Sequence, residues 1–344
     1  MNVQKNIPLA RLTTMKIGGK ANFVVDVTTR EELRQTYQNA KQYNQPVYII
    51  GSGSNLIARS EGFPGIIIHN KIPGITTIAD DHESTTIAAG GGEIWDDLVK
   101  YSVGLNLSGI EAMSGIPGTV GAAPVQNIGA YGQELADTFI SLEAYDRETD
   151  TFVTLTWDNC SFSYRNSIFR STAPNRYAIY KVTVKLWKKT PEPPFYESLQ
   201  QRFDELGITA YTPKTVRDNV LAIRSDKLPD PKVLPNAGSF FKNAIVEKWQ
   251  ADALREKYFD IKTFDQDDGK VKIPAGWLIE ASDLKGEVLH GIKVHDKNAV
   301  VLINESATGY KDLAAAREEI VSAVRDNFQI VLEQEPLELT LEKA

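Results

Sequence analysis

Two glycine-rich stretches contain the residue types that a phosphate-binding site needs. The first reads Gly51-Ser52-Gly53-Ser54-Asn55 and follows the apolar run Val47–Ile50, which predicts a short buried strand. Alternate glycines allow backbone N–H groups to converge on one point, and such a cradle commonly holds a phosphate. Ser52, Ser54 and Asn55 add side-chain donors. We therefore expect a phosphate-binding loop here, with an ordinary glycine turn as the alternative.

Two well-described phosphate loops do not match this stretch. The dinucleotide fingerprint needs a third glycine at the position where this chain has Leu56. The loop of nucleoside-triphosphate-binding proteins needs a Gly-Lys-Ser/Thr run, which does not follow. The ligand must therefore be inferred from other parts of the chain.

The second stretch extends over residues 114–132 and reads SGIPGTVGAAPVQNIGAYG. Many of its side chains are no larger than a methyl group, so the backbone can lie close against a flat ligand and offer it hydrogen-bond donors. Long irregular loops in compact domains are more often functional than idle. We expect this stretch to contact a ligand, and a loop without such a role is the alternative.

A basic cluster follows much later in this otherwise acidic chain. Its members are Arg224, Lys227, Lys232 and Lys242. Each one alone is typical of a solvated surface, but together they predict an anion-binding patch.

The first glycine stretch is positioned by a compact α/β unit. The run Phe23–Val27 predicts a strand, and Thr28 and Thr29 stand three residues before Glu31 and Glu32, which is the spacing of a capping box. The helix that follows has an apolar stripe made of Leu33, Tyr37 and Ala40.

Residues 60–190 are predicted to be mostly sheet. Strands are expected at 66–68, 85–89, 140–145, 152–157 and 178–187, with a short helix that has Ile94 and Leu98 on one side. In the last strand, alternation puts five apolar side chains on one face: Ala178, Tyr180, Val182, Val184 and Leu186.

A proline-rich break at residues 191–194 precedes a second, C-terminal α/β domain. Residues 195–218 are interpreted as an excursion and a linker, and a helix is expected at 220–224. We further predict helices at 245–258, 275–279 and 310–327, and strands at 299–304 and 329–332.

Composition limits the class of protein. A chain of 344 residues predicts two or three domains, and 42% hydrophobic and 24% charged residues are ordinary for a soluble globular protein. A net charge of −7 without a long basic run argues against nucleic acid as a partner. One cysteine and four scattered histidines argue against a disulfide and a metal site. The start of the chain lacks the apolar core of a signal peptide, and no apolar run approaches the ~20 residues of a membrane span, so we expect a cytoplasmic enzyme.

Together the motifs resemble the UDP-N-acetylenolpyruvoylglucosamine reductase family, flavoproteins of bacterial peptidoglycan precursor synthesis. The resemblance covers nearly the whole chain. It is carried, in order, by Ile17-Gly18-Gly19, by Gly51 to Asn55, by Ile116-Pro117-Gly118 through Asn127-Ile128-Gly129-Ala130-Tyr131-Gly132, by Tyr164-Arg165-Asn166-Ser167-Ile168-Phe169, by Asn236 to Asn243 and by Ala275-Gly276-Trp277-Leu278-Ile279.

This resemblance implies an α+β fold. A vanillyl-alcohol-oxidase-type FAD-binding domain, made of two α+β subdomains, would precede a C-terminal α/β substrate-binding domain. The expected boundaries are 1–68 and 69–218 for the two FAD-binding subdomains, with a tyrosine loop at about 191–218. The substrate-binding domain would span 219–325, and a tail at 326–344 would return to the active site.

The resemblance also implies FAD as the cofactor. The first glycine stretch would hold the FAD pyrophosphate, and the second would lie along the flavin and ribityl chain. The expected cofactor-binding residues are Gly51, Ser52, Gly53, Ser54, Asn55, Ile116, Pro117, Gly118, Gly121, Asn127, Gly129, Ala130 and Tyr131.

In the implied reaction, NADPH gives a hydride to FAD, which passes it to the methylene carbon of UDP-N-acetylglucosamine enolpyruvate to form UDP-N-acetylmuramate. The negative charge that develops needs a nearby cation, and the carbon beside the carboxylate needs a proton donor. By family position, Arg165 would hold the carboxylate, for which a planar guanidinium is suited. Ser239 would give the proton, and Glu335 would be a protonated carboxyl or an orienting partner.

The substrate-binding residues implied by the resemblance are Tyr196, Arg224, Lys227, Asn243 and Asn298. Two departures stand out. Pro336-Leu337 replaces the Val-Arg that members with a tyrosine loop often carry after the glutamate, and Ala122-Ala123 stands where serines can occur. We expect a monomer that takes this nucleotide sugar and NADPH, without nucleic-acid or membrane partners.

Two other functions remain open from the sequence. A flavin oxidase of the same FAD-binding superfamily would use oxygen and an alcohol. A nucleotide-sugar-binding protein without chemistry would be colourless and would stay so after FAD is added.

Overall fold

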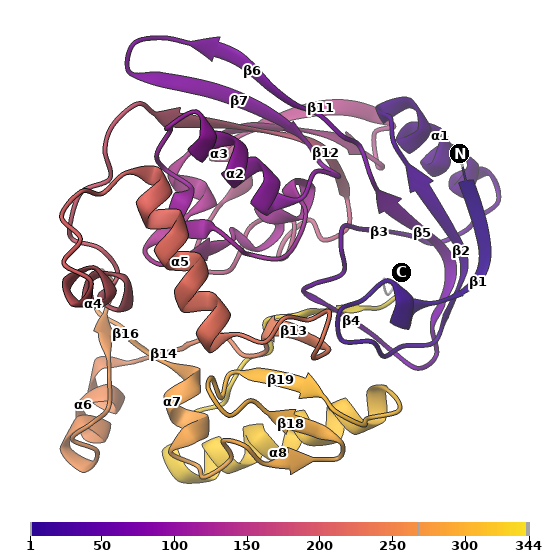
Figure 1. Ribbon diagram of the computed structural model, residues 1–344. Helices are drawn as coiled ribbons and strands as arrows, with labels where there is room; N and C mark the ends of the chain where they lie inside the picture. Colours follow the sequence, from indigo (N-terminus) through magenta and orange to yellow (C-terminus); the bar gives the residue numbers. More distant parts are fainter. Residues whose placement is uncertain (1, 267, 342–344) are drawn as a thin grey trace. The chain divides into compact units, whose positions relative to one another are not determined.

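The computed structural model describes residues 2–266 and 268–341 (Figure 1). The chain forms two compact units. Unit 1 comprises residues 1–7, 21–52 and 63–226. Unit 2 comprises residues 8–20, 53–62 and 227–344. The long C-terminal part of unit 2 thus begins close to the expected start of the substrate-binding domain, but two N-terminal segments join it. The finer subdomain boundaries stay a prediction.

The first sheet of unit 1 confirms the predicted α/β unit. Its order is β1-β2-β5-β3, and β2 and β3 both run parallel to β5. The helix α1 supplies the crossover that parallel strands require, and the capping box forms as expected: the Thr29 hydroxyl accepts from the Glu32 N–H, and the Glu32 carboxylate accepts from Thr28. The elements are β1 (Asn2–Pro8), β2 (Lys20–Val27), α1 (Arg30–Gln42), β3 (Val47–Ile50) and β5 (Phe63–Asn70).

The second sheet of unit 1 has the order β11-β10-β12-β7-β6 and is antiparallel throughout. Two short strands, β8 and β9, form a separate hairpin. The strands are β6 (Ile75–Asp80), β7 (Ser84–Gly90), β8 (Gly129–Ala130), β9 (Gln133–Glu134), β10 (Phe139–Asp146), β11 (Thr151–Thr156) and β12 (Tyr177–Trp187).

The prediction that five apolar side chains of β12 lie on one face is wrong. Ala178 and Tyr180 pack in the core beneath α1, whereas Val182, Val184 and Leu186 pack in a second core. The pairing of β12 with β10 shifts register at this point: Glu143 faces Lys181 and Ala144 faces Ile179, which leaves Tyr180 as an extra residue on β12. Such an irregularity disturbs the two-residue period on which the prediction depended.

The helices of unit 1 correct two further predictions. The helix α2 buries Trp95 rather than Ile94, which is 44% exposed, because Ile94 has an extended backbone and only caps the helix. The segment 195–218, expected as an excursion and a linker, contains α4 and the start of α5. Phe203 of α4 and Val220 of α5 pack in a small core. Pro213 opens α5, a position where its missing N–H costs no hydrogen bond. The helices are α2 (Trp95–Gly104), η2 (Glu111–Met113), η3 (Val120–Gln126), η4 (Leu135–Asp137), α3 (Trp157–Cys160), α4 (Glu197–Glu205) and α5 (Pro213–Lys227).

Unit 2 is built on an antiparallel sheet with the order β13-β19-β18-β17. Leu313, Ile320 and Val324 of α8 are part of its core, as the apolar spacing predicted. Met15 and Ile57, from the two N-terminal segments, lie in the same core. The elements are η1 (Leu9–Arg11), β4 (Leu56–Ala58), β13 (Asn236–Ser239), α7 (Ala275–Glu280), β17 (Val288–Leu289), β18 (Ile292–Val294), β19 (Val301–Asn304), α8 (Tyr310–Phe328) and β20 (Leu337–Leu339).

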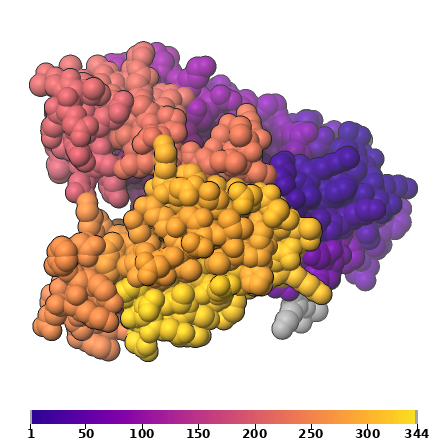
Figure 2. All heavy atoms as spheres, turned by 60° about the horizontal axis from the view of Figure 1, so that its bottom comes forward, coloured from indigo at the N-terminus to yellow at the C-terminus, as the bar shows by residue number. Residues whose placement is uncertain are grey.

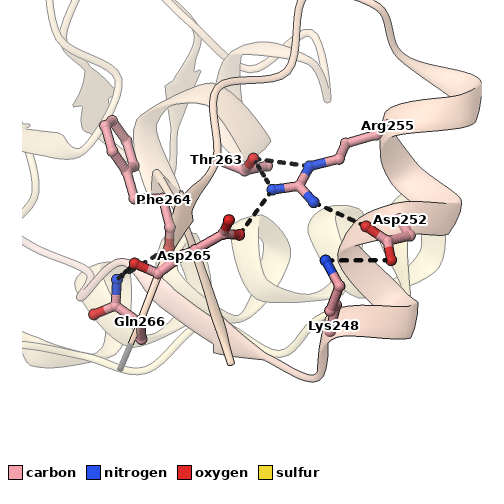
Figure 3. A network of polar contacts seen from close by, with 7 residues as sticks. All are labelled: Lys248, Asp252, Arg255, Thr263, Phe264, Asp265 and Gln266. Atoms are coloured by element: carbon pink, nitrogen blue, oxygen red, sulfur yellow. Dashed lines mark hydrogen bonds and ion pairs between the residues drawn. The ribbon is translucent and has the colours of Figure 1, made fainter. Parts of the chain in front are cut away.

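A smaller sheet with the order β14-β16-β15 carries α6 and forms the darker orange lobe of unit 2 in Figure 2. The helix predicted at 245–258 begins only at Lys248, because residues 244–246 pair as a strand with β16. Arg255 ties α6 to β15 through Thr263 and Asp265, as Figure 3 shows. The elements are β14 (Ala244–Val246), α6 (Lys248–Lys257), β15 (Phe264–Asp265) and β16 (Val271–Ile273).

The predicted final strand at 329–332 is wrong. Gln329 has a left-handed backbone (φ 57°) and ends α8, and Ile330 and Leu332 pack in the core without forming a strand. The last strand is β20, which runs parallel to β4. Among residues 2–266 and 268–341, no helix has both the length and the apolar character needed to cross a membrane.

Candidate functional site

The two glycine-rich stretches meet within unit 1. A Cβ on Gly51 would overlap the Thr119 hydroxyl, so glycine is required at that point. The Thr119 side chain is only 5% exposed, and its hydroxyl has no hydrogen-bond partner in the described part of the chain. Thr119 precedes η3 but does not cap it with its side chain. A buried hydroxyl without a partner is costly, so a bound ligand is its expected partner.

The second stretch is more regular than the sequence suggested, because η3 forms in its middle. The Val120 N–H donates to Glu93 O (2.8 Å) and the Gly121 N–H donates to Gly91 O (2.9 Å). A Cβ on Gly121 would lie 2.9 Å from two backbone oxygens. The expected cofactor residues Ile116, Gly118, Gly129 and Ala130 are half-buried, and Pro117 is exposed.

Asn127 shapes this stretch from inside. It is fully buried with a left-handed backbone (φ 45°). Its side-chain oxygen accepts from the Ala136 N–H (3.0 Å), and its side-chain nitrogen donates to Ser163 O (3.4 Å). Both ends of the amide are therefore engaged within unit 1, and a direct contact with the cofactor stays a prediction.

Arg165 is attached to the second stretch. Its Nη2 donates to Gly129 O at 2.8 Å, and its guanidinium lies 5.3 Å from the centre of the Tyr164 ring. Its backbone is left-handed (φ 52°), a conformation that non-glycine residues rarely adopt and that is often found at functional sites.

Tyr131, Tyr196 and Arg224 form a contact cluster within unit 1. The rings of Tyr131 and Tyr196 meet edge to face with their centres 5.7 Å apart, and Arg224 lies close enough to interact electrostatically with the Tyr131 phenol. Burial raises the pKa of Tyr131, which Arg224 opposes, so the phenol stays protonated. Burial lowers the pKa of Arg224, but a guanidinium keeps its charge in proteins. A predicted cofactor residue thus meets two predicted substrate residues.

A supporting ion pair that the sequence did not predict lies near this cluster. Both carboxylate oxygens of Asp96 on α2 accept from Arg217 on α5, at 2.6 and 2.8 Å, and Asp96 also accepts from the Gly115 N–H at 2.6 Å. Burial alone would raise the pKa of Asp96. The hydrogen bonds from Arg217 and Gly115 outweigh burial and hold this pKa below its usual range. The pair fixes α5, which carries Arg224, against the start of the second stretch.

In unit 2, the structure brings the Ser239 segment and the Glu335 segment together. Ser239 ends β13, and the Glu335 N–H donates to the carbonyl of the next residue, Phe240, at 2.9 Å. The Lys242 N–H donates to Glu333 O, also at 2.9 Å, which extends the contact. Both Ser239 and Glu335 are half-buried.

Asn236 shapes the backbone before Ser239. Its side-chain oxygen accepts from the Gly238 N–H (2.9 Å), and its nitrogen donates to Leu234 O (2.7 Å). Gly238 has a positive φ of 72°, which favours glycine there.

Two predicted substrate residues lie at the start of α7. Asn243 accepts from the Ala275 N–H at 3.1 Å, and the Asn298 oxygen would lie 3.8 Å from a Cβ on Gly276. Lys227 ends α5 and is exposed.

The predicted site residues are divided between the units. Unit 1 holds Gly51, Ser52, the second stretch, Arg165, Tyr196 and Arg224. Unit 2 holds Gly53, Ser54, Asn55, Lys227, Ser239, Asn243, Asn298 and Glu335. The chain passes from unit 1 to unit 2 inside the first glycine stretch.

Family models match two parts of the chain. Residues 21–156 match the FAD binding domain, and residues 230–338 match the C-terminal domain of UDP-N-acetylenolpyruvoylglucosamine reductase. The fold and the glycine-rich site therefore define a flavoprotein with an FAD-binding domain.

Similar proteins cover the whole length. UDP-N-acetylenolpyruvoylglucosamine reductase of Burkholderia cenocepacia is 40% identical over 96% of this chain and 95% of its own. That of Neisseria gonorrhoeae is 40% identical over 95% of both chains. A crystal structure of the Thermus caldophilus enzyme shares the fold, with a TM-score of 0.65 and 24% identity over 99% of this chain and 100% of its own. The chain belongs to the UDP-N-acetylenolpyruvoylglucosamine reductase family, and the expected α+β fold is confirmed.

The residues of unit 1 fit FAD. Gly51 allows a close backbone approach, and the Thr119 hydroxyl offers a buried donor beside it. Gly118 and Gly121 keep the second stretch free of bulky side chains on either side of Thr119. These residues, with Ser52, would hold the cofactor from unit 1.

Proposed function

We propose that this chain is an NADPH-dependent reductase that converts UDP-N-acetylglucosamine enolpyruvate to UDP-N-acetylmuramate. The observation that carries the proposal is the backbone bond between Glu335 and Phe240, which joins the segments of the two proposed proton-handling residues. The family membership of the chain supplies the substrate class.

When bound, FAD supplies the two-electron chemistry that carries a hydride equivalent from NADPH to the methylene carbon. The protein must then manage charge and proton. Arg165 stabilises the negative charge that develops on the substrate carboxylate, because its planar guanidinium matches that group. Ser239 gives a proton to the carbon beside the carboxylate, and Glu335 acts as a protonated carboxyl or an orienting partner.

Binding of the nucleotide sugar is assigned to Tyr196, Arg224, Lys227, Asn243 and Asn298. Arg224 and Lys227 offer positive charge to the diphosphate or carboxylate. Leu337 cannot make the substrate contact that an arginine at this position would make. Recognition of the nucleotide sugar therefore depends more on Arg224 and Lys227. A cytoplasmic monomer without nucleic-acid or membrane partners is part of the proposal.

The direct test is NADPH consumption by the purified, FAD-loaded protein. Consumption should depend on the enolpyruvyl nucleotide sugar and should not occur with UDP-N-acetylglucosamine, which lacks the reacting group. NADPH oxidation that yields hydrogen peroxide regardless of nucleotide sugar would instead indicate an oxidase. Protein that binds the nucleotide sugar but never retains FAD would indicate a binding protein without chemistry.

A further inference from the structure

The tail that carries Glu335 is anchored on both sides within unit 2. Before Glu335, residue 334 pairs with Phe241 in an isolated bridge. After it, the Leu337 N–H donates to Asn55 O at 3.1 Å, and β20 then pairs with β4. Asn55 belongs to the first glycine stretch, so the tail connects a predicted catalytic residue to a predicted cofactor loop.

Glu338 anchors this tail through its side chain. One carboxylate oxygen accepts from Arg59, with its Nε at 2.9 Å. The other accepts from Tyr310 Oη and Arg317 Nη1, each at 2.8 Å. These donors come from the segment after β4 and from α8. Charge-assisted bonds of this kind are about twice as strong as neutral ones.

The same network reaches across Glu335. Arg317 Nη1 also donates to the Gln334 side-chain oxygen at 2.8 Å, and the Gln334 side-chain nitrogen donates to Pro336 O at 2.7 Å. The neighbours of Glu335 on both sides are therefore tied to the guanidinium that binds Glu338. Pro336 restricts the backbone further, because its ring fixes φ.

An ordinary surface ion pair does not account for Glu338. Exposed pairs contribute about 0–1 kcal/mol because solvent screens them. The Glu338 side chain is only 16% exposed and has three donor residues. Burial alone would raise the pKa of Glu338, but these bonds outweigh burial and hold the pKa below its usual range. The carboxyl group is therefore an anion at neutral pH.

We propose that Glu338 is a positioning residue that fixes Glu335, through Arg317 and Gln334, for its part in the reduction of the substrate. The proposal depends on the role given to Glu335 under Proposed function. No motif points to this role, because Glu338 and its partners Arg59, Tyr310 and Arg317 are not part of the motifs that carry the family resemblance.

A double-mutant cycle tests this inference in the full-length, FAD-loaded protein. The variants are Glu338→Ala, Glu335→Gln and the two together. The rate of flavin reoxidation by substrate is measured anaerobically after reduction with NADPH, together with the rate of that reduction. If Glu338 acts through Glu335, Glu338→Ala should slow reoxidation about tenfold in the wild type and less than twofold in Glu335→Gln, because coupled residues are not additive.

Controls separate positioning from general damage. Glu333→Ala alters the same tail at a side chain that is 74% exposed, and reoxidation should stay within twofold of wild type. Flavin reduction by NADPH should also stay within twofold in Glu338→Ala. Equal losses in both backgrounds, or an equal loss in both half-reactions, would overturn the proposal.

A second variant, Arg317→Lys, tests the same inference if the Glu338→Ala protein does not fold. Arg317→Lys keeps a positive charge near Glu338 but cannot reproduce the guanidinium that joins Glu338 to Gln334. It should slow reoxidation selectively, and a folded Arg317→Lys protein with an unchanged rate would refute the inference. A wild-type protein that is never reoxidised by the substrate would instead refute the proposed function.

Discussion

Ser239 is assigned a demanding role, because a serine hydroxyl is a weak acid in water. The proton acceptor is an enolate-like carbon, which is strongly basic. Arg165 is proposed to stabilise the negative charge, and Glu335 to act as a protonated carboxyl or an orienting partner. The Asx turn of Asn236 and the positive φ of Gly238 fix the backbone that presents the hydroxyl.

Replacing Ser239 by alanine should separate the two half-reactions. Removal of a general acid typically costs 10²–10⁴-fold, so reoxidation of reduced flavin by substrate should fall by at least about 100-fold. Reduction by NADPH needs no proton from Ser239 and should stay within about twofold. Rapid-mixing absorbance measurements follow both steps, and unimpaired reoxidation would remove Ser239 from the role of proton donor.

Thr119 should contribute to FAD affinity rather than to chemistry. Thr119→Val removes the buried hydroxyl with little change of shape, and loss of one hydrogen bond of about 1.4 kcal/mol raises the dissociation constant about tenfold. Flavin fluorescence quenching on the apoprotein measures the constant. Thr119→Ser, which keeps the hydroxyl, is the matched control and should bind nearly as wild type; equal affinities for all three proteins would contradict the assignment.

Among single residues, those in local motifs could be predicted from the sequence, whereas those defined by a distant partner could not. The glycines stand in short local patterns, and Ser239 and Glu335 were predicted by their position in the family resemblance. Thr119 was missed because its meaning comes from Gly51, which is distant in the sequence. Asp96 and Arg217 were missed for the same reason, since their ion pair joins residues 121 positions apart.

At the scale of elements, local signals predicted what local forces decide. The capping box and the stripe of Leu33, Tyr37 and Ala40 define α1 correctly, and the apolar spacing of α8 does the same. The errors arose where tertiary contacts prevail. The register shift beside β12 and the pairing of residues 244–246 with β16 depend on partner strands that a single segment does not reveal.

The contact between α2 and α5 should depend on pH through Asp96. Because its folded pKa is depressed, the Asp96 carboxylate adds stability that is fully present above its unfolded pKa of about 3.9 and is lost as pH falls through the lower folded value. Asp96→Asn should lower the free energy of unfolding at pH 7 by about 2 kcal/mol, the usual range for hydrogen bonds to a charged group.

Urea unfolding measures this effect. The stability gap between wild type and Asp96→Asn should narrow as the pH is lowered below about 4. The exposed carboxylate of Glu333 offers a matched control, since Glu333→Gln should change stability by less than about 0.5 kcal/mol at either pH. A gap that is constant with pH would contradict the assigned role of Asp96.

At the scale of the whole molecule, unit 2 is built from three separate parts of the chain. Residues 8–20 and 53–62 contribute Met15, Ile17 and Ile57 to its core, each at most 2% exposed. The expected start of the C-terminal domain at residue 219 stays a prediction. The N-terminal contributors to unit 2 follow from long-range packing, which periodicity does not record.

A fragment of residues 227–344 should therefore fail to fold alone. Loss of three buried apolar side chains, at about 1.5–3 kcal/mol each, approaches the whole stability of a typical domain, about 5–15 kcal/mol. Circular dichroism with thermal melting tests this, with the full chain as the control. A cooperative transition of the fragment near that of the full chain would contradict this view of unit 2.

The reductase function is tested most directly by a single turnover of the wild-type protein. FAD-loaded protein is reduced anaerobically with one equivalent of NADPH and then mixed with UDP-N-acetylglucosamine enolpyruvate. The proposed function predicts that the visible absorption of oxidised flavin returns with one equivalent of substrate, and that the product carries two more hydrogens than the substrate. Flavin that stays reduced until oxygen is admitted, with the nucleotide sugar recovered unchanged, would contradict it.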